Sequence, residues 1–204
     1  LLQEELRSDL EQIVKPLEDE GIRVQTVVTC GEHSFLQVIH QVVSEKHDLV
    51  MMLADGVASV REQLFGTLSM HLMRKCPCAV WVVKTTQRKK LRNVFAAIDP
   101  DPENPARDKL NAEILKRASG VATSHNAELH VIHAWHVLGG ELNRSRRWMT
   151  RSEIRLYVEN AAETQRKRLN ELLTTHSELS PTVHMLQGKP GSVIPKTIAK
   201  ATGD

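Results

Sequence analysis

The sequence predicts an α/β protein with parallel sheets, arranged as two tandem units. Segments with helical spacing of apolar residues alternate along the chain with short apolar or β-branched runs, which is typical of parallel sheets covered by helices. A cationic connector without aromatic residues divides the chain near its middle. A block of helix, strand, helix and Asp occurs twice, 156 residues apart, so that Asp204 matches Asp48 and Val183 matches Val27.

The first half of the chain contains the predicted elements of the first unit. Apolar residues at helical spacing predict a helix from the start of the chain to about Glu20, closed by Gly21. The alternating, β-branched segment 22–30 predicts a strand, and the helical spacing of segment 33–46 predicts the next helix. The remaining predicted elements are a buried strand at 47–53, a helix at 68–75 and a second buried strand at 79–84.

The second half repeats the alternation. Its predicted strands lie at 93–99, 127–137 and 181–187. A helix that follows a loop rich in proline and acidic residues is expected to run to about His125, and a long amphipathic helix is expected over 151–176. A turn over 188–191 then leads into a helix that starts at Ser192.

The domain boundary is predicted in the connector. Residues 1–86 form the later part of a first unit, residues 87–90 the linker and residues 91–204 the earlier part of a second unit. The chain opens without Met inside an amphipathic pattern and stops where another strand should follow. We therefore expect that the natural protein is longer, or that a dimer partner or the other unit covers the open edge of the sheet.

Composition and charge exclude several classes of protein. Lys and Arg (27) nearly balance Asp and Glu (25), so the net charge of +2 creates no overall field that would attract nucleic acid or an anionic membrane. No apolar run approaches the roughly 20 residues that a membrane-spanning helix needs. Three cysteines without a signal-peptide pattern suit a reducing compartment, and we expect a cytoplasmic protein.

The segments "HDLVMML" (47–53), "GTLSMHLMRKCPCAVWVV" (66–83) and "NVFAAID" (93–99) resemble the tandem universal stress proteins, and the resemblance covers essentially the whole chain. It implies Rossmann-like units of the adenine nucleotide alpha hydrolase-like type, each a five-stranded parallel sheet in the order 3-2-1-4-5 with flanking helices. It also implies a non-enzymatic stress-response role through ligand binding and assembly, either as a homodimer or by pairing of the tandem units. Some members of the family hold an adenine nucleotide between the end of the first strand and the loop after the fourth.

The family motif for this nucleotide is Gly, two residues, Gly, nine residues, then Gly and a hydroxyl residue. The glycines let the backbone approach phosphate, and the last Gly begins a helix whose free N–H groups and dipole accept an anion. Gly56, Gly66 and Thr67 match the motif, but Leu53 stands where the first Gly should be. Since a branched side chain there should crowd a ribose or phosphate, we expect a degenerate nucleotide motif, with Gly56 and Gly66 kept as turn and helix-start residues.

In the second unit, the resemblance assigns adenosine contacts to Asp99, at the end of the first strand, and to the backbone of Ala134 in the second strand. ATP is therefore the candidate cofactor of this unit. A carboxylate at the carboxyl end of a parallel strand can bind ribose hydroxyls. The alternative is that Asp99 only caps the loop before Pro100.

His130, His133 and His136 suggest a zinc cluster at first sight. Side chains alternate between the two faces of a strand, so His130 and His136 share one face and His133 points to the other. One metal ion cannot bind all three. We expect partly buried polar positions rather than a metal site.

Cys76 and Cys78 flank Pro77, at the point where a predicted helix stops and a strand begins. Cysteine ligands of a metal usually lie in Cys-x-x-Cys spacing with further ligands nearby, whereas only one residue separates these two. We interpret both as small, half-buried packing residues. A metal or redox site is the alternative.

Two other functions are alternatives to ligand binding. Weak ATP hydrolysis in the second unit needs a positioned nucleophile and base or a pair of carboxylates, and neither these nor a Gly-Lys-Ser/Thr phosphate loop occurs with diagnostic spacing, so an enzyme is not expected. A nucleic-acid-associated regulator would bind through five basic residues. These are Lys89, Lys90, Arg144, Arg146 and Arg147. A solvated linker and loop are favoured instead, because no aromatic residues interleave the charges of the linker.

Overall fold

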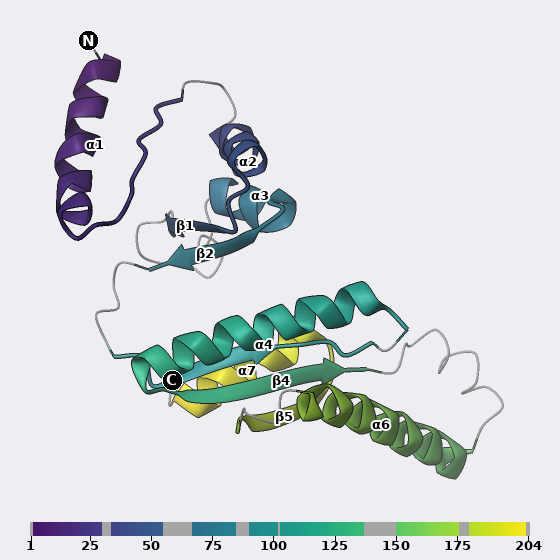
Figure 1. Cartoon of the computed structure of the whole chain (residues 1–204). Helices are drawn as coiled ribbons and strands as arrows, with labels where there is room; N and C mark the ends of the chain where they lie inside the picture. The colour runs from purple at the N-terminus through teal and green to yellow at the C-terminus, as the bar shows by residue number, and fades with distance from the viewer. Residues whose placement is uncertain are drawn as a thin grey trace. The chain divides into compact units, whose positions relative to one another are not determined.

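The computed structural model describes residues 2–29, 34–54, 67–84, 90–101, 103–136, 150–175 and 180–202. The chain divides into two compact units, Leu1–Arg88 and Lys89–Asp204, and the division falls inside the connector predicted at 87–90. In the described parts of the chain, every helix is too short or too polar to cross a bilayer. Figure 1 shows the elements of both units.

In its described residues, the first unit contains a two-stranded parallel sheet and three helices. Its elements are α1 (Leu2–Asp19), α2 (Ser34–Glu45), β1 (Leu49–Leu53), α3 (Thr67–Lys75) and β2 (Ala79–Val83). In the register of the pair, Met51 lies beside Trp81. Helices α2 and α3 pack together. The rings of Phe35 and His71 stack with their centroids 4.3 Å apart, and Val42 and Leu72 are buried.

Residues 22–29 form no strand, so the prediction for segment 22–30 is wrong for its described residues. The expected alternation is present, since Val24, Thr26 and Val28 are half-buried between exposed neighbours. No described strand pairs with this segment, which Figure 1 shows as an extended stretch after α1. A strand requires hydrogen bonds to a neighbouring strand, so the side-chain pattern alone did not produce one.

In its described residues, the second unit contains a three-stranded parallel sheet in the order β3-β4-β5. Its elements are β3 (Asn93–Ala97), α4 (Pro105–His125), β4 (Glu128–Trp135), α6 (Arg151–Thr174), β5 (Thr182–Gln187) and α7 (Pro190–Thr202). Both sheets are parallel and flanked by helices, which confirms the predicted architecture. The resemblance implies the strand order 3-2-1-4-5. Strands β5, β4 and β3 lie side by side as strands 3, 2 and 1 of that order would, and β1 and β2 lie side by side as strands 4 and 5 would.

The core of the second unit lies where α4 and α6 cover the sheet. Its buried residues are Ala96, Ile98, Leu115, Val131 and Leu169. Asn104 caps the start of helix α4, where its side chain accepts a hydrogen bond from the N–H of Arg107, and Asn126 caps its end in the left-handed conformation. These caps fix the two ends of the helix that lies over β3 and β4.

Gly188 joins β5 to α7. Its φ is +144°, and a Cβ built there would lie 2.5 Å from Cγ1 of Val193. Its N–H donates to the carbonyl of Trp135 at 2.8 Å, which ties the end of β5 to the end of β4. Only glycine suits this turn. Helix α7 starts at Pro190, two residues before the predicted start, because proline is well suited to a first helical position.

Candidate functional site

A cavity of about 600 Å³ opens in the second unit where β3 and β4 end. This volume lies within the range of roughly 300–1,000 Å³ found for small-molecule pockets. Asp99 and Ala134, which the resemblance assigned to adenosine, both line it. Arg107 and Asn111 of α4 and Ile194 of α7 complete much of the rest of the wall. The carboxyl ends of parallel strands are the usual place for ligands in such sheets.

The backbone of Asp99 is held by a single buried side chain. The N–H of Asp99 donates to Oδ1 of Asn111 at 3.1 Å, and Nδ2 of Asn111 donates to the carbonyl of Asp99 at 3.0 Å. Asn111 is 2% exposed. The N–H of Ile98 donates to the carbonyl of Ile132 at 2.9 Å, so the chain is fixed on both sides of the strand end. The Asp99 carboxylate, in contrast, is 64% exposed.

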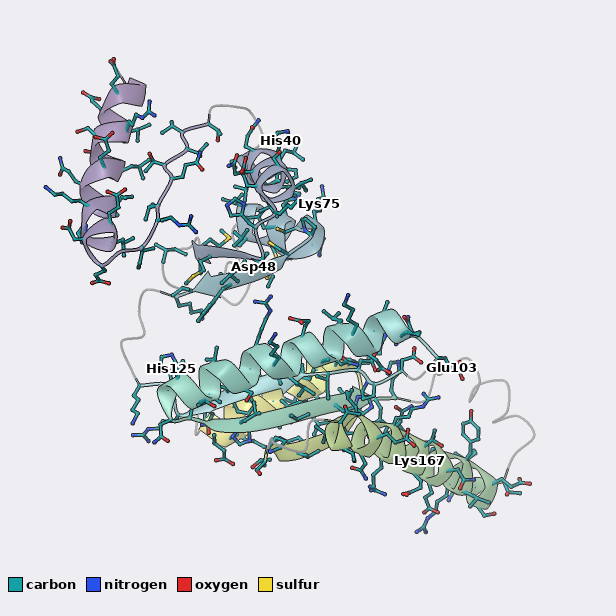
Figure 2. All side chains as sticks on the ribbon, viewed as in Figure 1. His40, Asp48, Lys75, Glu103, His125 and Lys167 are labelled. Atoms are coloured by element: carbon teal, nitrogen blue, oxygen red, sulfur yellow. The ribbon has the colours of Figure 1, made fainter. Side chains whose placement is uncertain are left out.

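Arg107 bridges two carboxylates at the mouth of the cavity. Its Nη1 lies 3.1 Å from Oδ2 of Asp99 and 3.2 Å from Oδ2 of Asp101. Figure 2 shows Glu103 near the start of α4 and His125 at the other end of this helix. Arg107 lies in the first turn of α4, close to Glu103 in the chain. Because Arg107 and Asp99 are both largely exposed, the pair stabilises the fold by about 1 kcal/mol at most. The pair can therefore separate at little cost in stability.

His133 reaches the same cavity from β4 and is 1% exposed. Its Nδ1 lies 3.2 Å from the carbonyl of Ile98, so Nδ1 carries a proton and donates it. Its Nε2 lies 3.1 Å from Oε1 of Gln165 in α6. His133 thus links β3, β4 and α6.

The structure brings together some of the predicted site residues and not others. Asp99 and Ala134 share one cavity, and Ala134 pairs with Leu186 in the sheet. Thr67 belongs to the first unit, as the first residue of α3. Gly56 and Gly66 lie outside the described residues. Leu53, the last residue of β1, is 58% exposed. Whether these first-unit residues bind a nucleotide stays a prediction.

Sequence reasoning missed Arg107, Asn111, His133 and Gln165 as cavity residues. A signal for Asn111 was present, because it lies on the helical stripe shared by three apolar positions that pack inward. These are Leu115, Ala118 and Ala122. A polar residue in a buried stripe must find hydrogen-bond partners. Arg107 and Gln165 carry no comparable signal, since exposed helix faces are rich in such residues.

The histidines of β4 separate as the strand alternation requires. His130 is 6% exposed and lies between Nε2 of His184 at 3.1 Å and Oδ1 of Asn93 at 3.1 Å. The ring of His130 stacks on that of Phe95, with the centroids 4.6 Å apart. None of these partners is shared with His133. His130 therefore links all three strands of the sheet. Across the described ranges, no three His, Cys, Asp or Glu residues gather around a point that could hold a metal ion.

The residues considered for nucleic-acid binding are largely outside the described part of the chain. Lys89, Arg144, Arg146 and Arg147 fall there, and only Lys90 is described, as an exposed residue. The nucleic-acid alternative therefore stays untested.

Comparison with known proteins shows clear similarity. Residues 1–84 match the model of the universal stress protein family. Universal stress protein E of Escherichia coli strain K12 is 29% identical over 118 residues, which are 57% of this chain and 37% of that protein. The chain thus spans little more than a third of the length of this curated relative.

Two solved structures share the fold. A protein of unknown function from Pseudomonas aeruginosa PAO1 has a TM-score of 0.73 at 20% identity, over 95% of this chain and 63% of that one. A universal stress protein from Archaeoglobus fulgidus DSM 4304 has a TM-score of 0.61 at 16% identity, over 98% and 64% of the two chains. At these identities, the likeness concerns the fold alone. The chain is therefore similar to the universal stress proteins over residues 1–84, and it shares the parallel α/β fold of the two solved structures.

Proposed function

We propose that this protein acts in the stress response without catalysis, by binding an adenine nucleotide in the cavity of its second unit. The observation that carries this proposal is that Asp99 and Ala134 line one cavity of about 600 Å³ at the carboxyl ends of β3 and β4. ATP is the ligand to which the family resemblance points.

The cavity offers complementary groups for a nucleoside. The exposed carboxylate of Asp99 can accept hydrogen bonds from ribose hydroxyls once Arg107 moves away. The backbone of Ala134 lies near the carboxyl end of β4, where the resemblance expects the base. Released from Asp99, the Arg107 guanidinium becomes available for a phosphate. The positive end of the α7 dipole, at Pro190, adds to the attraction for an anion.

The lining chemistry favours binding over catalysis. The described lining includes no Ser, Thr, Cys, Lys or Tyr. Its groups that could act as nucleophile or base are Asp99, which is paired with Arg107, and the histidines His133 and His136. His133 is committed to structural hydrogen bonds through both ring nitrogens. Weak ATP hydrolysis is therefore the second-ranked function.

Assembly is the other part of the proposed function, in the cytoplasm and through a homodimer or pairing of tandem units. One face of the β1-β2 sheet supports it. Met51 is 60% exposed, Leu53 58% and Trp81 42%, and strand alternation puts all three on the same side. Adjoining exposed apolar residues of this size typically mark a surface that another chain or domain covers.

Equilibrium dialysis with labelled ATP tests the ligand. We expect saturable binding that Asp99→Ala weakens at least about tenfold, since the loss of hydrogen bonds to a charged group costs about 1.5–3 kcal/mol. Glu103→Gln is the matched control, because it removes an exposed carboxylate next to α4 that does not line the cavity. ATP binding that survives Asp99→Ala and is lost in Gly66→Leu would move the site to the first unit and contradict the proposal. Magnesium-dependent turnover above background would favour the enzymatic alternative.

A further inference from the structure

The junction between α3 and β2 places two thiols in contact. Sγ of Cys76 lies 3.6 Å from Sγ of Cys78, and Sγ of Cys78 lies 3.6 Å from the carbonyl oxygen of Ala79. Both cysteines are free and half-buried. Figure 2 shows Lys75 at the end of α3, directly before this junction. Half-buried thiols remain within reach of small molecules, unlike the fully buried cysteines of a protein core.

Regular structure on each side holds the two thiols together. The N–H of Cys76 donates to the carbonyl of Leu72 at 2.8 Å, so Cys76 is tied to the last turn of α3. Cys78 directly precedes Ala79, whose place in β2 is set by pairing with Leu49 of β1. Pro77 between them has a restricted φ and removes one degree of freedom. The contact is therefore a property of the helix–strand junction.

We propose that Cys76 and Cys78 form a redox-active dithiol that exchanges with small disulfides of the glutathione class and closes to an intramolecular disulfide. A disulfide requires a sulfur–sulfur distance of about 2.05 Å, so the two sulfur atoms must approach each other by about 1.5 Å. Side-chain rotation can supply most of this movement. A ring closed across a single residue is strained, and strained disulfides are easily reduced again.

The order of the chemical steps follows from the two environments. Sγ of Cys78 is engaged with the carbonyl oxygen of Ala79 at 3.6 Å, and burial, followed by the hydrogen bond with Cys76, raises the pKa of its thiol, so we assign Cys78 to the second step. The Cys76 thiolate attacks one sulfur of glutathione disulfide, which forms a mixed disulfide and releases one glutathione thiolate that takes up a proton. Cys78 then loses its proton and attacks Sγ of Cys76, which breaks the mixed disulfide and releases the second glutathione. Two protein thiols are oxidised and one glutathione disulfide is reduced to two glutathione molecules.

Intact-mass measurement in glutathione redox buffers tests the dithiol. The Cys30→Ser variant leaves only the two junction cysteines. We expect it to lose two hydrogens per chain without a retained glutathione, and to regain them on reduction. Adding Cys78→Ser should trap glutathione on Cys76, whereas adding Cys76→Ser should give slower labelling of Cys78. Stable glutathione adducts in the Cys30→Ser protein, or no change in mass, would overturn the proposal.

A second measurement separates the effect of the fold from that of the local sequence. We expect the equilibrium constant for ring closure to be at least about tenfold larger in the folded Cys30→Ser protein than in the same protein unfolded in urea, a difference of about 1.4 kcal/mol. Circular dichroism of each variant establishes that it is folded. Equal constants in the two states would show that the junction does not position the thiols.

Discussion

The Asn111→Ala substitution tests how the cavity is built. Asn111 makes two hydrogen bonds with the backbone of Asp99, and each is expected to contribute a net of about 0.5–1.5 kcal/mol. Their loss costs about 1–3 kcal/mol, and the higher helix propensity of Ala returns roughly 0.5 kcal/mol. We therefore expect the free energy of unfolding of the second unit to fall by about 1–2 kcal/mol.

Urea unfolding followed by tryptophan fluorescence measures this change. Replacing Trp81 and Trp148 by Phe leaves Trp135, which is 8% exposed at the end of β4, as the only tryptophan and so as a reporter of the second unit. At a urea m value of about 1–3 kcal/mol/M, the transition midpoint should fall by roughly 1 M. The m value itself should not change, because the substitution removes contacts without changing the surface that unfolding exposes.

Leu110→Ala is the matched control. Leu110 precedes Asn111 in α4 and is 59% exposed, so its truncation should change the free energy of unfolding by no more than about 0.5 kcal/mol. If Asn111→Ala costs no more than this control, the two hydrogen bonds do not hold the strand end, and the account of the cavity is wrong.

Two further predictions concern the turn after β5 and the start of α6. Gly188→Ala should lower the free energy of unfolding by about 1–3 kcal/mol, because φ is +144° and the added Cβ would meet Val193, whereas Gly191→Ala, with open space around it, should be close to neutral in the same urea titration. At α6, the backbone N–H of Thr150, followed by its hydroxyl, lowers the pKa of the Glu153 carboxyl below its ordinary value. This contribution to stability is present above about pH 4.3 and is lost as the pH falls through the lowered pKa, so Glu153→Gln should have a lower Tm than the native protein at pH 7 and an equal Tm at pH 2. A difference in Tm that persists unchanged at low pH would exclude the capping carboxylate as its cause.

Much of the fold could be predicted because helices and buried parallel strands leave local marks. The stripe of apolar residues that ends at Gly21 predicted α1, and the runs at 47–53 and 79–84 predicted β1 and β2. Boundaries were less accurate where capping decided them. Helix α7 begins at Pro190 rather than Ser192, because proline is well suited to a first helical position.

The candidate site was only half predictable. Asp99 and Ala134 were identified by resemblance, each on its own strand, and the parallel pairing of β3 with β4 brings both to one cavity. Arg107 and Asn111 were missed because their role depends on how α4 lies over the strand ends. A hydrogen bond between residues twelve positions apart, as between Asp99 and Asn111, leaves no periodic trace in a sequence.

The sequence by itself determined the type and order of the helices and of the five described strands, and the opposite facing of His130 and His133. These follow from local hydrogen bonding and from side-chain periods of 3.6 and 2 residues. The tertiary structure alone decided the fate of the two matching segments at Val27 and Val183. Val183 of β5 pairs with Val131 of β4, whereas no described strand pairs with Val27. Both segments nevertheless carry a strand-like pattern. A helix completes its hydrogen bonds within itself, but a strand completes them only with a neighbour.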